Sequence, residues 1–137
     1  MRVYISGAIT GQPGLNQRVF SIAEAALIIM GHEPINPLSM SDVDGEWADY
    51  IINDLKKLRT ADAMTILPGS GSSVGCRIER LFAEKLGIPL VSLPAYPHGE
   101  EQLYTQEQLE ILVKSQKLRW VQEEEQLDWE LGKMEGV

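Results

Sequence analysis

Two short apolar runs, each ending in a turn rich in glycine and serine, carry the residues that could do chemistry. The first is Val3–Gly11 (Val-Tyr-Ile-Ser-Gly-Ala-Ile-Thr-Gly), and the second begins at Ala61 and continues to Glu79. If both runs are strands of a parallel sheet, the turns emerge at the carboxyl ends of strands, where ligands bind. A loop of backbone N–H groups beside a carboxylate suits a small molecule with an anionic end and an electrophilic carbon.

Glu79 lies in the first turn of the helix that this second turn should start. Helix N-termini stabilise negative charge, so an exposed helix-start glutamate is one reading. A functional reading is favoured by the Gly/Ser-rich loop before it. It is also favoured by the position of Glu79 within one helical turn of Cys76, Phe82 and Ala83, which is not a purely polar face.

Asp54 is the second unusual carboxylate. On a helix its neighbours would be Tyr50, Ile51 and Leu58, which places it within or beside an apolar stripe. Burying an unpaired charge is costly. Asp54 therefore needs either a structural partner, such as a loop N–H or Arg59, or a functional role.

Tyr4 lies within the first run, and Asp62 lies near the start of the second. Strand alternation puts Tyr4 and Ser6 on one face and Val3 and Ile5 on the other. Tyr4 is then either a functional hydroxyl or a core residue. Asp62 directly precedes the expected central strand, Ala63–Leu67, where it either reaches the site or caps local N–H groups of a turn.

The second turn is rich in hydroxyls and can be read as an anion cradle at a helix N-terminus or as a plain loop. Its small residues are Gly69, Ser70, Gly71, Ser72, Ser73 and Gly75. It is not a Walker P-loop, because no Gly-Lys-Ser/Thr follows. The first turn, with Gly7 and Gly11, has the wrong glycine spacing for a dinucleotide fingerprint.

Strands alternating with helices should position these residues. We predict strands at Val3–Ser6, Glu33–Asn36, Ala63–Leu67 and Pro89–Leu93, and helices at Leu15–Met30, Glu46–Arg59 and Cys76–Leu86. This alternation is typical of βαβ units, with right-handed crossovers placing helices on both faces of the sheet. The prediction is an α/β three-layer sandwich with a mostly parallel sheet of four or five strands.

The chain divides by composition into an α/β domain, residues 1–99, and an acidic extension of the same domain, residues 100–137. Apolar residues recur at helical spacing between Glu100 and Leu131, without glycine or proline, so one or two amphipathic helices are expected there. They would pack on the core or a partner subunit, or else form a regulatory arm.

Charge and cysteine content narrow the class of protein. A net charge of −8 argues against nucleic-acid polymers as partners. No apolar run is long enough for a membrane span, and the single cysteine, Cys76, cannot form an internal disulfide. We expect a cytoplasmic protein. His32 and His98 belong to no cluster of metal-ligand spacing, so neither a metal nor a cofactor is expected.

The ordered motifs resemble those of the nucleoside 2-deoxyribosyltransferase superfamily. They are Tyr4–Gly11, Asn53-Asp54-Leu55, Ala61-Asp62-Ala63 and Ser73–Glu79, which cover roughly residues 1–93. The chain looks most like the short phage and bacterial members with a "YISGPMTG" start. It is also similar to the 2′-deoxynucleoside 5′-phosphate N-hydrolases.

The resemblance implies a flavodoxin-like fold, a homodimer or larger homo-oligomer, and cleavage of an N-glycosidic bond. By matching position, Glu79 would be the nucleophile at C1′, Tyr4 would orient it, and Asp54 would contact the sugar or assist the departing base. The substrate would lie against the first loop (Gly7, Ala8, Ile9, Thr10, Gly11) and against Asp62, Ser73 and Gly75.

The residue six positions before the nucleophile separates the substrate classes in this superfamily. Relatives acting on nucleosides tend to have an acid there, and the nucleotide hydrolases have a serine that contacts the 5′-phosphate. This chain has Ser73, which favours a nucleoside 5′-monophosphate. It departs from the hydrolases at Thr10, where they have an arginine.

Three alternatives stay open from the sequence. One is a ribonucleoside monophosphate phosphoribohydrolase, because residues 68–79 faintly resemble the "PGGxGTxxE" loop of that group. Another is a catalytically silent nucleotide-binding protein. The third is an interaction protein whose acidic tail is the functional part.

Overall fold

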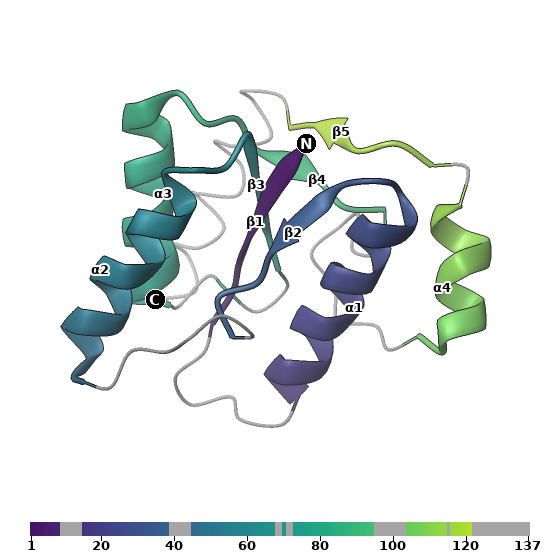
Figure 1. Ribbon diagram of the computed structural model, residues 1–137, viewed down its shortest axis with the longest axis horizontal. Coiled ribbons are helices and arrows are strands. Elements are labelled where there is room, and N and C mark those ends of the chain that lie inside the picture. The colour runs from purple at the N-terminus through teal and green to yellow at the C-terminus, as the bar shows by residue number, and fades with distance from the viewer. Residues whose placement is uncertain are drawn as a thin grey trace, which may run out of the picture.

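The computed structural model describes residues 1–8, 15–38, 45–67, 70, 73–94, 104–114 and 116–121. Strands and helices alternate as predicted (Figure 1). The elements are β1 (Arg2–Ser6), α1 (Leu15–Ile29), β2 (Glu33–Ile35), α2 (Trp47–Leu58), β3 (Ala63–Ile66), α3 (Val74–Leu86), β4 (Val91–Ser92), α4 (Gln106–Val113) and β5 (Arg119–Trp120). No helix in these ranges has both the length and the apolar character that crossing a bilayer requires.

The parallel part of the sheet has three strands, and β1 lies between the other two. Strand β1 pairs in parallel with β2 on one side and with β3 on the other. A parallel bridge between Met64 and Leu90 places β4 beyond β3, and β5 pairs with β4 in antiparallel orientation. The spatial order is therefore β2-β1-β3-β4-β5. After β2 the chain crosses back over β1 to form β3, which makes the β1/β3 boundary the topological switch point.

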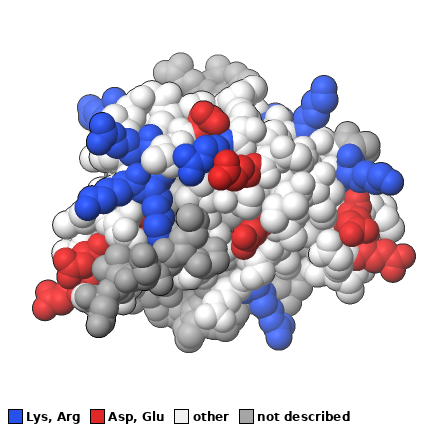
Figure 2. All heavy atoms as spheres, in the orientation of Figure 1, with Lys and Arg blue, Asp and Glu red and all other residues white. Residues whose placement is uncertain are grey.

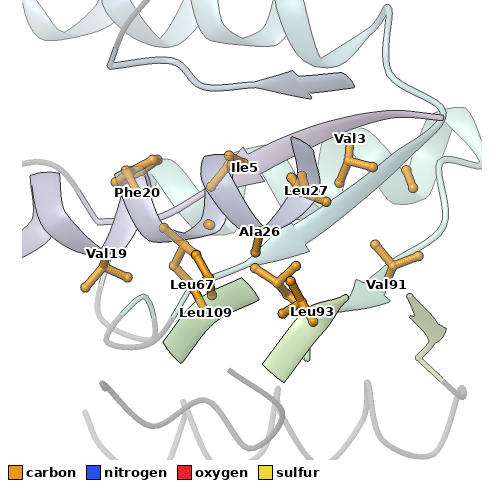
Figure 3. Packing of buried hydrophobic residues seen from close by; sticks show 13 residues of the cluster. Val3, Ile5, Val19, Phe20, Ala26, Leu27, Leu67, Val91, Leu93 and Leu109 are labelled. Carbon is orange, nitrogen blue, oxygen red and sulfur yellow. The ribbon is translucent and has the colours of Figure 1, made fainter. Parts of the chain in front are cut away.

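Helices cover both faces of the sheet (Figure 1). Helices α1 and α4 share one hydrophobic core with Val3 and Ile5 of β1, and Figure 3 shows this packing. On the opposite face, which α2 and α3 cover, Tyr4 packs with Leu58 of α2 and Ala83 of α3. The predicted alternation along β1 is confirmed, and it sends Tyr4 toward the helices that carry Asp54 and Glu79.

Helix α3 begins at Val74, two residues earlier than predicted, because Ser73 caps it. The Ser73 Oγ accepts a hydrogen bond from the Cys76 N–H at 3.3 Å, as expected of an N-cap serine. The helix ends at Gly87, whose φ of +73° is the left-handed conformation that favours glycine. Both ends of the helix that carries Glu79 are thus set by local sequence.

The prediction of helix through the acidic extension is wrong over part of its length. Helix α4 ends at Val113, and Arg119–Trp120 form β5 instead of a second helix. The edge of β4 accounts for the difference, because the Val121 N–H donates to the Leu90 carbonyl at 3.0 Å and Val121 is buried. Tertiary pairing here overrides helical spacing. Residues 100–103, 115 and 122–137 of the extension lie outside the described residues.

Gly7, which directly follows β1, is required by packing rather than by backbone conformation. A Cβ at this position would lie 2.8 Å from Phe20 Cζ and 3.0 Å from Leu67 Cδ1. Both of those side chains are buried in the core beneath α1. Any larger residue at position 7 must therefore displace the ring of Phe20.

We expect Gly7→Ala to lower the free energy of unfolding by about 1–3 kcal/mol, the usual cost of overpacking a core. Urea denaturation would measure it. In a Phe20→Leu background the ring atoms that the new methyl group meets are gone, so the same substitution should cost clearly less. Equal costs in both backgrounds would contradict this account.

Candidate functional site

The polar residues of interest gather at the carboxyl ends of β1 and β3. Ser6 is the last residue of β1, stands opposite Ile66 of β3, and accepts the Leu67 N–H on its carbonyl at 2.8 Å. From the end of β3 the chain continues to Ser70 and Ser73 and then into α3. This is the switch point of the sheet, where open α/β folds bind ligands.

Glu79 points into the protein and is only 5% exposed, so the solvent-facing reading does not hold. The Ser6 hydroxyl donates to Glu79 Oε1 at 3.3 Å. The other oxygen, Oε2, is buried without a hydrogen-bond partner among the described residues. Burial raises the pKa of Glu79 to about 7. Interaction with Tyr4 opposes that rise, the charge of Asp54 adds to it, and the Ser6 bond opposes it.

Tyr4 is fully buried and lies near both carboxyl groups. Burial first, and then the negative charges of Glu79 and Asp54, raise its pKa far above the ordinary value, so the hydroxyl keeps its proton. The hydroxyl is close enough to Glu79 to influence the pKa of that residue. Yet it forms no full hydrogen bond to any residue that the structure describes. A donor and an acceptor are therefore held side by side, and both are unsatisfied.

Asp54 approaches this pair from α2 and is 8% exposed. Burial raises its pKa to about 6, and the nearby charge of Lys57 opposes the rise. Gly75 of α3 faces α2 here, and a Cβ at this position would lie 3.1 Å from Ile51 Cδ1, so that the Ile51 side chain would have to shift slightly. Glycine at this position lets α3 pack closely against α2, so Gly75 has a clear packing role.

Two described serines between β3 and α3, Ser70 and Ser73, form hydrogen bonds with neighbouring residues. Ser70 is buried, and its hydroxyl donates to the Leu67 carbonyl at 2.6 Å. The Ser73 Oγ accepts from the Cys76 N–H, and its hydroxyl can also donate one hydrogen bond. Burial raises the pKa of the Cys76 thiol, and hydrogen bonds with Ser73, Ser6 and Ser70 oppose that rise.

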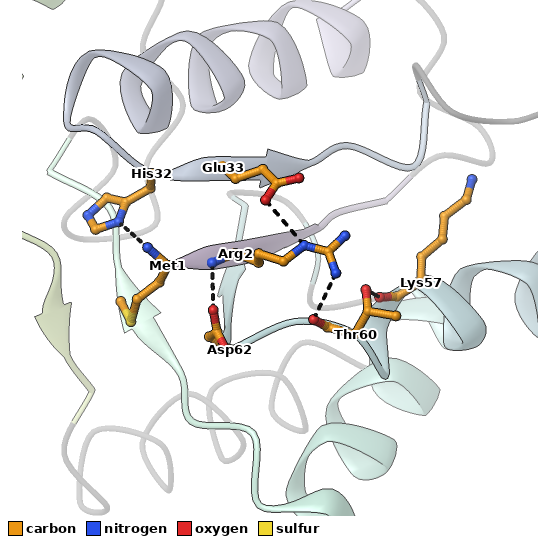
Figure 4. A network of polar contacts seen from close by, with 7 residues as sticks. All are labelled: Met1, Arg2, His32, Glu33, Lys57, Thr60 and Asp62. Carbon is orange, nitrogen blue, oxygen red and sulfur yellow. Dashed lines mark hydrogen bonds and ion pairs between the residues drawn. The ribbon is translucent and has the colours of Figure 1, made fainter.

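Asp62 is a correction, because the structure does not bring it to this group. Its Oδ2 accepts the Arg2 N–H at 2.8 Å (Figure 4). Its own N–H donates to the Arg2 carbonyl at 2.8 Å. Both residues lie at the amino ends of their strands, the opposite end from Ser6. Asp62 therefore has the turn-capping role that was the alternative reading of the sequence.

The first loop is described only in part. Gly7 and Ala8 are buried at the end of β1, and Ile9, Thr10 and Gly11 lie outside the described residues. In the part of the chain that is described, no three or more His, Cys, Asp or Glu residues are grouped so as to hold a metal ion.

Arg77 lies in the first turn of α3, next to this end of the sheet, whereas a group of other basic side chains lies away from it. In Figure 2 they gather at the upper left, over the ends of α2 and α3, where the last turns carry Lys56, Lys57 and Lys85. Cations there complement the C-terminal ends of the helix dipoles. An anionic group at the switch point would instead meet the N–H groups and the Ser73 hydroxyl at the start of α3.

Comparisons with known proteins agree with this fold. A family model described as a domain of unknown function, DUF4406, matches residues 1–92. The chain belongs to this family. Among solved structures it is similar to a 2-deoxyribosyltransferase from the psychrotolerant bacterium Bacillus psychrosaccharolyticus. The TM-score is 0.54 and the identity 21%, over 66% of this chain and 69% of that chain. A search of curated proteins finds no match.

The structural similarity confirms the resemblance to the nucleoside 2-deoxyribosyltransferase superfamily at the level of the fold. The structure of this DUF4406 protein also brings Tyr4, Asp54 and Glu79 together, as the motifs suggested. Ser6 is the residue to which the sequence analysis assigned no role. The available signal was strand alternation, because Ser6 follows Tyr4 by two residues and must share its face.

The buried carboxyl group of Glu79 should make stability depend on pH. Its pKa is about 7 in the folded protein and 4.5 ordinarily, so the unfolded chain loses the proton first. The contribution of Glu79 to the free energy of unfolding is therefore at its highest below pH 4.5, and it is lost as the pH rises from 4.5 toward 7. Glu79→Gln removes this loss. We expect it to stabilise the protein at pH 8 by on the order of 3 kcal/mol relative to its effect at pH 4.5.

Urea denaturation at several pH values would measure this difference. Glu84→Gln is the matched control, since Glu84 is an exposed glutamate on the same helix. A Glu79→Gln effect that is the same at pH 4.5 and pH 8 would show that the carboxyl group is not buried as described.

Proposed function

We propose that this protein cleaves the N-glycosidic bond of a 2′-deoxynucleoside 5′-monophosphate or a deoxynucleoside, by hydrolysis or base transfer, with Glu79 as the nucleophile. One observation carries the proposal. Glu79 is buried at the switch point with one oxygen held by Ser6 and the other unpartnered among the described residues. A buried polar atom without a partner is costly, so a ligand that engages Oε2 would relieve that cost.

The chemistry of such a carboxylate is that of a retaining glycosidase. Bond cleavage at C1′ develops positive charge on the sugar, which a close carboxylate stabilises and then captures as a glycosyl ester. Tyr4 assists because its neutral hydroxyl can donate to the carboxylate or to the sugar without adding negative charge.

Asp54 has the properties of a proton donor for the leaving base. A carboxyl group with a pKa of about 6 retains a protonated fraction near neutral pH, whereas an ordinary aspartate does not. The two carboxyl groups then differ in role. Because Glu79 has the higher pKa, about 7, it must give up its proton before it attacks in the ionised form, and Asp54 must hold the proton that goes to the base. The second step returns a proton to Asp54 when water or another base attacks C1′.

A 5′-phosphate would bind at the start of α3. The first N–H groups of a helix favour an anion, and the Ser73 hydroxyl can donate to phosphate oxygens. Gly7, Ala8, Ile9, Thr10, Gly11 and Gly75 complete the proposed substrate-binding residues. A homodimer or larger homo-oligomer in the cytoplasm, with neither metal nor cofactor, remains part of the proposal.

The comparisons support this assignment in general terms. The solved structure that shares the fold is that of a 2-deoxyribosyltransferase, which makes a nucleoside or nucleotide the first substrates to test. A silent nucleotide-binding protein or a ribonucleotide phosphoribohydrolase would give different outcomes in the same assay.

We expect the purified protein to release free base from at least one member of a panel of nucleosides and 5′-monophosphates, in deoxy and ribo forms, as followed by chromatography. Glu79→Gln should lower turnover by about 1,000-fold or more, because it removes the nucleophile while keeping its shape. The exposed Glu84→Gln should leave turnover unchanged.

Each other outcome of this base-release assay has a defined interpretation. Release from ribonucleotides alone would favour the phosphoribohydrolase. No release from any compound, together with tight nucleotide binding by calorimetry, would favour the silent binding protein. Full activity of Glu79→Gln would exclude Glu79 as the nucleophile.

Replacing Ser73 by aspartate should shift the substrate preference from nucleotide to nucleoside. Aspartate caps a helix about as well as serine, so α3 should remain intact. Its charge would repel a 5′-phosphate, and we expect kcat/KM for the monophosphate to fall by about 10-fold or more relative to the nucleoside. An unchanged ratio would place the phosphate elsewhere.

A further inference from the structure

Ser6 occupies a rigid position. It is fully buried at the end of the central strand, its backbone is paired with β3, and its carbonyl accepts the Leu67 N–H. Its side chain shares a face with Tyr4 and projects toward α3. The hydroxyl is therefore held in place by the sheet and not by a mobile loop.

The two oxygens of Glu79 are not equivalent in this structure. Oε1 accepts the Ser6 hydroxyl at 3.3 Å across 73 residues of sequence, and both side chains are buried. Oε2 has no hydrogen-bond partner among the described residues. One oxygen is fixed to the sheet, and the other is available.

We propose that Ser6 is a positioning residue that holds Glu79 Oε1 and thereby makes Oε2 the oxygen that bonds to the sugar. The inference rests on the proposed function and deepens it, because it assigns the attacking atom and names the residue that selects it. Ser6 acts through Glu79 and need not touch the substrate.

The bond changes are consistent with this assignment. In the first step the Oε2–C1′ bond forms and the C1′–N bond breaks, and the base leaves with the electron pair and takes the proton of Asp54. Oε1 becomes the carbonyl oxygen of the ester and keeps its hydrogen bond from Ser6. In the hydrolytic second step water bonds to C1′ and gives a proton to Asp54, and the C1′–Oε2 electron pair returns to Glu79.

A serine suits this position because its hydroxyl donates without carrying charge. A cation at the same place would stabilise the free carboxylate strongly and weaken its attack, whereas a neutral donor serves both the carboxylate and the ester. The other groups that act on Glu79 are Tyr4 and Asp54, and the Cys76 thiol lies beside Ser6. Tyr4 forms no full bond to Glu79, which leaves the orientation of the carboxylate to Ser6.

The test compares Ser6→Ala and Ser6→Thr with Ser92→Ala as the control. Ser92 is a buried serine of β4, outside the group around Glu79. With the best substrate of the panel, Ser6→Ala should lower kcat by about 10- to 100-fold, the range for loss of a hydrogen bond to a charged group, with little change in KM. Ser6→Thr keeps the hydroxyl and should recover most of kcat, and Ser92→Ala should match the wild type.

A second readout does not depend on turnover. Carbon-13 NMR titration of the Glu79 carboxyl group should show a higher pKa in Ser6→Ala than in the wild type, because the bond from Ser6 favours the ionised form. Ser6→Thr should restore the wild-type value if it folds. Should the threonine variant fail to fold, the alanine variant and Ser92→Ala still give the comparison.

The outcomes separate the two proposals. An unchanged Glu79 pKa in Ser6→Ala overturns the positioning role, and so does an unchanged kcat. If the wild type releases no base from any compound, the proposed function fails. A raised Glu79 pKa in Ser6→Ala would then still show that Ser6 holds the carboxyl group.

Discussion

The hydrogen bond between Ser6 and Glu79 depends on the central parallel pairing of β1 with β3. That pairing sets the ends of the two strands side by side, and α3 then runs back across the sheet from the end of β3. Only this geometry allows residues 73 positions apart to meet in the interior. The sheet thus places a carboxyl group where it is deprived of water, and its perturbed pKa follows from that burial.

Tight packing on both faces of the sheet maintains the arrangement. On one face Gly7 lets the ring of Phe20 approach the end of β1. On the other face Gly75 lets α3 approach Ile51 of α2, which brings Asp54 toward Glu79. The glycines that the sequence suggested as ligand contacts therefore also have packing roles. A larger residue at position 7 would press on Phe20, and one at position 75 would press on Ile51, even without touching a ligand.

Two buried carboxyl groups with different pKa values are an electrostatic cost to the fold. Burial raises both values, and the charge of Asp54 further raises that of Glu79. Groups kept at such a cost are frequently functional, since structural needs alone are met more cheaply by apolar residues. The Tyr4 hydroxyl and Glu79 Oε2, which have no hydrogen-bond partner in the part of the chain that the structure describes, belong to the same pattern. The proposed glycosidic chemistry uses each of these features.

The sequence alone determined the order of strands and helices as far as β4, the alternation along β1 and the C-terminal end of α3, because these depend on local periodicity and capping. It also marked Glu79 and Asp54 as anomalous, since each is a charge beside apolar neighbours. Only the tertiary structure could decide how far each was buried, that Ser6 holds Glu79, and that Asp62 lies at the other end of the strands. Likewise, only the tertiary structure showed that Arg119–Trp120, where helix was expected, form a strand that pairs with β4. These facts depend on which distant segments meet, and no local pattern encodes that.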